Sequence, residues 1–184
     1  MSRIDDLAGT YERHISAPWQ RNLAGAQKTI FVVYAKEDER KLRSHIGEFK
    51  VRTEQSGHPW SNFDMTKLFA LWMSETDYRE QYFECPEDLK LKLNSEFFQF
   101  VVDKLVAALT DPSIGEDTVV AVTGAAALFG FIKVSEVLEK SVHEIRGRLV
   151  LFFPGTYDQD SYWLLDARDG WNYLATPVAL HSGE

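Results

Sequence analysis

The chain has almost no cysteine and no long hydrophobic stretch. Cys85 is the single cysteine among 184 residues, so no intramolecular disulfide is available to the fold. It precedes Pro86 in a polar segment with nothing nearby that favours a thiolate, which indicates an ordinary small side chain. No uninterrupted apolar run approaches the roughly 20 residues that a membrane span requires, so we expect no membrane partner.

Basic residues are also scarce. The sequence holds 20 Lys and Arg against 28 Asp and Glu, which gives a net charge of −8 at pH 7. Binding of nucleic-acid phosphates needs clustered Lys and Arg in excess, so we expect no broad direct contact with nucleic acid. Residues 1–6 introduce acids early and lead into no apolar run, unlike a secretory signal, and the expected location is the cytoplasm.

The motifs of the common ligand-binding and catalytic loops are missing. A dinucleotide fingerprint needs three spaced glycines, but after Gly124 an alanine and a phenylalanine occupy the second and third positions. A P-loop needs Gly-Lys-Ser/Thr in succession, whereas two residues separate Gly130 from Lys133. The sequence contains no Gly-x-Ser-x-Gly elbow, and no histidine has the spacing of a zinc-binding helix. We therefore expect no catalytic residue, no cofactor and no metal site.

Three runs of β-branched, aromatic and aliphatic residues indicate strands, at residues 29–34, 118–122 and 148–153. Strands that are apolar at every position are typical of a parallel sheet covered on both faces, and helix-forming segments separate the three runs. We therefore predict a three-layer α/β fold, a mostly parallel sheet with helices on both faces. Such a fold is Rossmann-like but lacks the dinucleotide fingerprint.

Helical periodicity and turn residues predict the remaining elements of a single domain over residues 1–184. An apolar stripe predicts an amphipathic helix that ends near Pro18, with a linker to residue 27 and the core at 28–180. The other expected elements are a helix at 36–49, a strand at 60–64, a helix from Thr66, a long buried helix at 89–109, a helix after Gly124 with Phe129 inward, and two short strands at 161–180 around an Asp169–Gly170 turn.

Parallel strands would bring three loops to one edge of the predicted sheet. They follow the strands at residues 35–38, 123–125 and 154–158, and ligands of such sheets bind at the carboxyl ends of the strands. The weak anion-site candidates there are Thr123, Gly124, Lys133, Gly155 and Thr156. Two plainer interpretations stay open, since Gly124 also permits close packing of a helix on the sheet and 154–158 also reads as a tight turn.

The segment from Phe152 to Asp158 resembles an element of the BrxB family of bacteriophage-exclusion (BREX) defence operons. The resemblance includes a strand followed by Thr123-Gly124, the run from Phe31 to Arg40, and Asn172-Tyr173, and it covers the chain from about residue 28 onward. The chain is similar to a divergent member, because family positions that hold Gly, Pro, Arg and Tyr-Arg are occupied here by Ala126, Gly130, Lys133 and Leu174-Ala175.

This resemblance implies a small accessory protein of an anti-phage system that associates with PglZ, the large alkaline-phosphatase-like protein of such operons, and is not known as an enzyme. The aromatic content of 13% offers anchors for an interface. The candidate contact residues are Tyr157, Asp158, Trp163, Trp171 and Tyr173. Two alternatives are a small nucleotide- or phosphate-binding regulatory protein of the same system, and an enzyme that uses Asp38 and Asp158 as a carboxylate pair.

Overall fold

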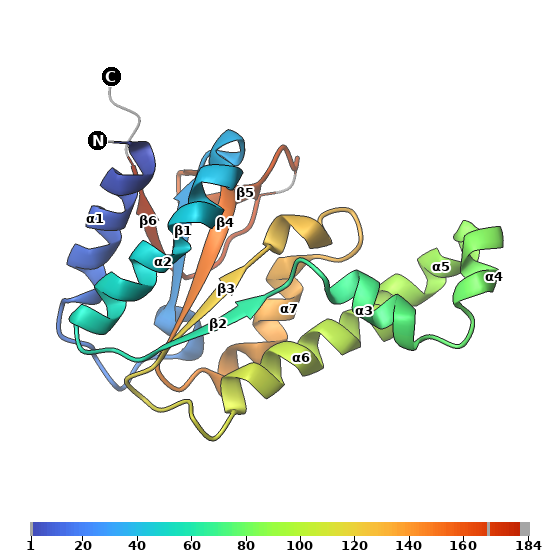
Figure 1. Cartoon of the computed structure of the whole chain (residues 1–184), viewed down its shortest axis with the longest axis horizontal. Helices are drawn as coiled ribbons and strands as arrows, with labels where there is room; N and C mark the ends of the chain where they lie inside the picture. The colour runs from blue at the N-terminus through green and yellow to red at the C-terminus, as the bar shows by residue number, and fades with distance from the viewer. Residues whose placement is uncertain (1, 169, 181–184) are drawn as a thin grey trace.

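The computed structural model describes residues 2–168 and 170–180 (Figure 1). Within these residues the chain forms a six-stranded sheet with the order β2-β3-β4-β1-β6, and β5 pairs with β4 off this path. All neighbours along the path are parallel, and the β4–β5 pair is antiparallel. Helices cover both faces of the sheet, so the predicted α/β fold is confirmed.

The strands are β1 (Thr29–Tyr34), β2 (Trp60–Asp64), β3 (Val119–Thr123), β4 (Arg148–Asp158), β5 (Ser161–Leu164) and β6 (Thr176–Ala179). The helices are α1 (Arg3–Ile15), α2 (Glu39–Gln55), α3 (Leu68–Glu75), α4 (Arg79–Glu84), α5 (Pro86–Lys92), α6 (Phe98–Thr110) and α7 (Val134–Ser141). Short 3₁₀ turns precede β1 and α2 and flank α7, and a π-helical turn (Leu93–Phe97) joins α5 to α6. No helix among the described residues has the length and apolar character needed to cross a membrane.

The order in which the chain forms its strands decides which face each helix covers. From β1 it passes through α2 to the edge strand β2, and it returns through α6 and α7 on the opposite face to β3 and β4. Right-handed crossovers require this change of face when the direction of travel reverses. α1 packs beside α2 on the first face.

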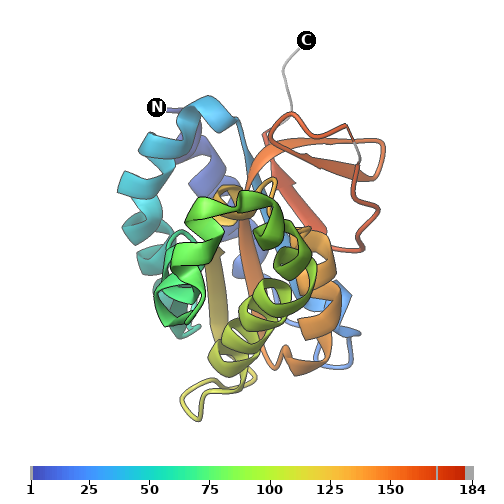
Figure 2. The ribbon, with the colours of Figure 1, turned by 90° about the vertical axis from the view of Figure 1, so that its right-hand side faces the viewer.

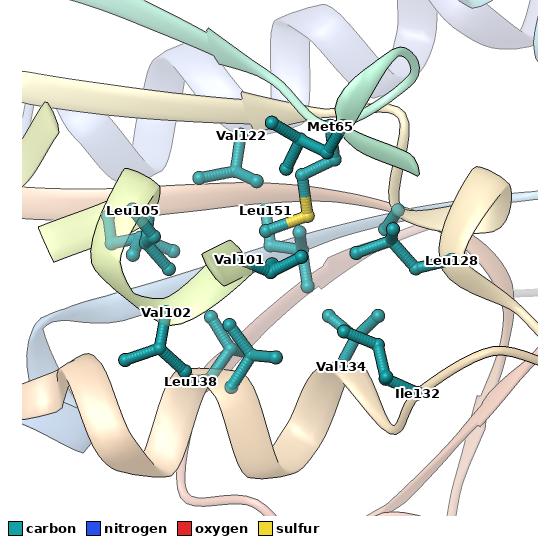
Figure 3. Packing of buried hydrophobic residues seen from close by; sticks show 14 of the residues in the cluster. Met65, Val101, Val102, Leu105, Val122, Leu128, Ile132, Val134, Leu138 and Leu151 are labelled. Atoms are coloured by element: carbon teal, nitrogen blue, oxygen red, sulfur yellow. The ribbon is translucent and has the colours of Figure 1, made fainter. Parts of the chain in front are cut away.

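Strand β1 explains the continuous apolar runs of the sequence. All six of its residues are buried. Ile30 and Val32 pack beneath α1 and α2, whereas Phe31 and Val33 belong to the core on the other face. Figure 3 shows part of this second core, where Val122 and Leu151 of the sheet meet side chains of α6 and α7.

Helix α1 forms as the sequence predicts and belongs to the first core. A capping box begins it, in which the Asp5 amide donates to Ser2 Oγ (3.3 Å) and the Ser2 amide donates to Asp5 Oδ2 (2.7 Å). The predicted stripe of Ile4, Leu7, Tyr11 and Ile15 is buried. Tyr11 is also tied to α2, because its hydroxyl lies 2.6 Å from Thr53 Oγ1.

The third predicted strand does not end at Pro154. β4 continues to Asp158, and its last residues pair with β5 as an antiparallel hairpin. Pro154 lies where β4 leaves its parallel partner β1 and the hairpin begins, and its carbonyl accepts a hydrogen bond from the Leu165 amide (2.8 Å). The expectation of a loop at 154–158 is therefore wrong, because a proline at the end of one pairing does not prevent the strand from entering another.

Two predicted helices are shorter than expected. The stripe at 89–109 divides at the π-helical turn, and only its second part forms a fully buried row on the sheet, while Leu91 is 78% exposed. After Gly124 the chain makes a 3₁₀ turn and a loop before α7 begins, because Gly130 has a positive φ of 84° that ends helical geometry. Phe129 is consequently 45% exposed rather than inward. The two short strands of the tail are found as β5 and β6, and Asp169 lies outside the described residues.

Candidate functional site

The carboxyl ends of β1 and β4 form the switch point of the sheet. The two strands are neighbours, but the chain leaves β1 towards α2 on one face and leaves β4 towards β5 and the tail on the other. Ligand sites of open α/β sheets lie at such a point. Because β4 extends beyond the sheet as a hairpin, two separate clefts open at this edge, one lined by the hairpin and one beneath α2.

The hairpin cleft has a volume of about 460 Å³ and is lined by Lys36 to Asp38 after β1, by Gly155 to Tyr157 of β4, and by the start of α1, Leu165-Asp166 and the end of β6. Lys36 donates to Asp166 Oδ1 at 2.6 Å. This hydrogen bond raises the pKa of Lys36, so the amine is held as a cation with its own counter-ion. The cleft therefore carries charges of both signs, and two of them, Lys36 and Asp166, are paired with each other.

The α2 cleft, with a volume of about 250 Å³, lies between the ends of β1, β2 and β3 and the first turns of α2. Its polar side chains form a chain of hydrogen bonds. Tyr34 donates to Glu39, Arg43 donates to Glu39 Oε1 (2.7 Å) and reaches Thr66 Oγ1 (3.4 Å), and Thr66 donates to Asp64 Oδ1 from both its amide (2.9 Å) and its hydroxyl (2.6 Å). Most of the hydrogen-bonding capacity of this cleft is thus used internally.

The charge states in the α2 cleft follow from these bonds. Burial, strengthened by the bond to Glu39, raises the pKa of Tyr34, so the phenol stays protonated and donates. The hydrogen bond to Glu39 raises the pKa of Arg43. Burial by itself would raise the pKa of Asp64, but the two bonds from Thr66, together with the nearby positive charges of Arg43 and Lys67, outweigh it and lower the pKa. Near neutral pH these shifts favour a neutral Tyr34, a charged Arg43 and an ionised Asp64.

Gly124 closes the α2 cleft and has a clear structural role. Its φ is +76°, and a Cβ at this position would lie 2.4 Å from Thr66 Oγ1 and 2.6 Å from Asp64 Oδ1. The turn after β3 therefore approaches the Asp64–Thr66 turn after β2, rather than allowing a helix to pack on the sheet.

The anion-site candidates do not line one cleft. Gly155 and Thr156 line the hairpin cleft, and Thr123 and Gly124 line the α2 cleft. Lys133 lines a third, the tail cleft of about 790 Å³ between the 129–139 segment and residues 164–168 and 170–173, where it lies 3.7 Å from Glu136. A joint site of these five residues is therefore not formed, because the grouping assumed that 123–125 and 154–158 were adjacent loops.

The carboxylate pair is likewise not assembled in a cleft. Asp38 lines the hairpin cleft and lies 3.8 Å from Lys41 Nζ. Asp158 stands at the tip of the hairpin opposite Ser161, exposed and outside the lining of all three clefts described above. The extension of β4 past Pro154 is what carries Asp158 away from the edge.

The predicted partner-contact residues divide into exposed and packed ones. Tyr173 is 8% exposed and stacks on Phe31 (centroids 5.5 Å apart), and Trp171 packs edge-on against Phe153 (5.1 Å). Tyr157 packs on Tyr162 while its hydroxyl bonds Asp160 (2.9 Å), and Trp163 is half-buried. Asp158 is the fully exposed member of the five. Two of the four aromatic candidates, Trp171 and Tyr173, thus cover the Phe31 and Phe153 rings.

Several functional candidates were not identified from the sequence. The acceptors and donors of the α2 cleft include Tyr34, Glu39, Arg43 and Thr66, and the sequence signal for one pair is Asp64-x-Thr66 directly after a strand. Among residues 2–168 and 170–180, one group has the arrangement of metal ligands, formed by Asp5 of α1 with His45 and Glu48 of α2. Arg52 already donates to Glu48 Oε1 (2.6 Å), which competes with a metal for that carboxylate.

Three large apolar side chains are exposed in the segment between α3 and α6. Tyr78, Phe83 and Leu91 are 67%, 73% and 78% exposed, and they lie around α4 and α5, away from the sheet.

No protein-family model, curated protein or solved structure matches this chain.

Proposed function

We propose that this chain is a non-catalytic accessory protein of a BREX-type anti-phage system that acts in the cytoplasm by binding a PglZ-like protein of the alkaline-phosphatase superfamily. The observation that carries the proposal is a contrast within the described residues. Several charged groups of the clefts at the sheet edge are bonded within them, Lys36 to Asp166 in one and Arg43 to Glu39 in the other, whereas large apolar side chains are exposed elsewhere. That distribution favours a surface for protein binding over a catalytic pocket.

The resemblance to the BrxB family supplies the biological setting of the proposal. The segment that carries it, Phe152 to Asp158, forms the end of β4 and half of the β4–β5 hairpin. Phe152 and Phe153 of this segment fill the two cores, one on each face, and the following residues line the hairpin cleft. The segment that carries the resemblance thus contributes to core packing on both faces and to the lining of one cleft.

The alternative of a nucleotide- or phosphate-binding regulator has less support. Lys36 in the hairpin cleft is neutralised by Asp166, and Glu37 and Asp38 stand beside it. Lys133 in the tail cleft faces Glu136. An anion would have to compete with these carboxylates for each lysine, which weakens its binding.

Co-expression with the PglZ-like protein encoded in the same operon tests the proposal. We expect a stable complex that co-elutes in size-exclusion chromatography at micromolar concentration, and loss of phage exclusion when the gene for this chain is deleted. Failure of the two purified proteins to associate at that concentration would overturn the proposal. A thermal shift with ATP or inorganic phosphate that Lys133→Ala abolishes would instead favour the regulator.

A further inference from the structure

A helical arm (residues 76–92, which contain α4 and α5) projects from the sheet. Figure 1 shows these helices extending beyond the ends of the strands, and Figure 2 shows them turned towards the viewer in front of the body. The arm joins α6 through the π-helical turn, a geometry found disproportionately at functional positions. Every residue of α5 is exposed or half-buried. This part of the chain therefore adds little to the core.

The arm carries the apolar side chains that the core does not use. Tyr82 turns inward and is 7% exposed, while Tyr78, Phe83 and Leu91 on the same arm are at least two-thirds exposed. α4 and α5 are in contact with each other. Water solvates large apolar side chains poorly, and three of them are concentrated in this short, projecting element.

The charge around these side chains is predominantly acidic. The arm contains the acids Asp77, Glu80, Glu84, Glu87 and Asp88 against the bases Arg79, Lys90 and Lys92. Two of the bases are already engaged, since Lys90 lies 3.0 Å from Glu87 and Lys92 lies 2.6 Å from Glu96. An acidic apolar surface repels nucleic-acid phosphates and anionic lipid, and it complements an apolar protein patch surrounded by Lys and Arg.

We infer that the helical arm is the element by which this chain docks on its partner protein, and that the partner presents an apolar patch rimmed by basic residues. The inference rests on the proposed function and names the surface that performs it. Tyr78 and Phe83 act as anchors, because aromatic side chains that become desolvated at the centre of an interface contribute most of its binding energy. The acidic side chains around them steer association and set the register.

Binding of the PglZ-like protein from the same operon, measured by biolayer interferometry, tests the arm directly. The triple variant Tyr78→Ser, Phe83→Ser, Leu91→Ser removes the three exposed side chains. Leu174→Ser is the matched control, because Leu174 is 74% exposed but belongs to the tail. We expect at least a tenfold increase in Kd for the triple variant, a change below twofold for the control, and weaker binding by the wild type as salt increases. Circular dichroism and the melting temperature should show that the triple variant remains folded.

Cys85 provides a second readout that needs no substitution. It is a free, exposed thiol between α4 and α5. Bound partner should slow its reaction with a thiol reagent at least fivefold. If the wild type binds, the triple variant binds equally well and Cys85 stays reactive, the arm is not the docking element while the proposed function stands. If the wild type does not bind, the proposed function fails and the arm inference falls with it. A homodimer that the triple variant dissociates would also overturn the inference, because a second copy would then cover the arm.

Discussion

Phenylalanine side chains are buried in the central strands but exposed on the helical arm. Phe152 in β4 is 1% exposed, and its ring meets Phe49 edge-on with centroids 5.0 Å apart. Phe83 in α4 is 73% exposed. A side chain of the first kind stabilises the isolated chain, whereas one of the second kind contributes to free energy only when another surface covers it. Exposure, rather than residue type, therefore separates the parts of this molecule that fold it from the part available for binding.

The largest expected difference between the two regions comes from the same substitution made in each. Phe152→Ala should reduce the free energy of unfolding by about 3–5 kcal/mol, because it leaves a cavity between β4 and α2. Phe83→Ala should change it by less than about 0.5 kcal/mol. Urea denaturation monitored by circular dichroism measures both. If the two variants lose similar amounts of unfolding free energy, Phe83 is packed in solution and the contrast between the central strands and the arm is wrong.

Two glycine substitutions compare a crowded backbone position at the sheet edge with an open one. Gly124→Ala should destabilise the protein by about 2–3 kcal/mol, because it combines a positive φ with a Cβ that clashes against Asp64 and Thr66. Gly130→Ala is the matched control, since Gly130 has a similar φ of +84° but no atom within 4 Å of its added Cβ. Strain alone should then cost about 1 kcal/mol. Equal losses in urea denaturation would show that the contact with the Asp64–Thr66 turn is not close.

Removing the bond of a buried tyrosine hydroxyl should have a smaller effect on the free energy of unfolding, and changing an exposed one should have none. Thr53→Val should cost about 1–2 kcal/mol, because it leaves the buried Tyr11 hydroxyl without the oxygen that lies 2.6 Å away. Tyr11→Phe should cost less, since Thr53 still donates to the Phe49 carbonyl (2.8 Å). Tyr78→Phe on the exposed arm should be neutral. In a double-mutant cycle, Tyr11→Phe should recover part of the loss caused by Thr53→Val, and strictly additive losses would contradict the pairing.

The elements that sequence could predict are those whose evidence is local. The buried run of β1 and the stripe of α1 each specify their own burial, and both are found as expected. Whether the strand ends at Pro154 depends on which strand lies beside it. The sequence alone therefore does not predict that β4 continues into a hairpin. The stripe at 89–109 keeps its period through the π-helical turn, but Leu89 and Leu93 are only half-buried, whereas its members in α6 are fully buried.

The candidate site was less predictable than the fold for the same reason. The α2 cleft joins Tyr34, Glu39 and Arg43 to a turn more than 20 residues away, and this meeting depends on strand order. The anion-site candidates were chosen as loop residues near one edge, yet the projecting hairpin and the tail distribute them over three clefts. Contacts between distant segments carry little signal in a single sequence, whereas periodicity within one segment carries much.

The smallest expected effect concerns acid stability at the sheet edge. The hydrogen bonds from Thr66 lower the pKa of Asp64 below its ordinary value of 3.8 despite the opposing effect of burial. A carboxyl group whose pKa is lower in the folded chain stabilises it fully above pH 3.8, and this contribution is lost as the pH falls below that value. Asp64→Asn should therefore destabilise the protein slightly at pH 6, within the roughly 0.5 kcal/mol typical of solvent-accessible groups, and the difference from wild type should shrink towards pH 3. Asp77→Asn on the arm makes the same change in net charge without the Thr66 contacts. If urea midpoints measured from pH 6 to pH 3 converge equally for both variants, the effect comes from overall charge and not from the sheet edge.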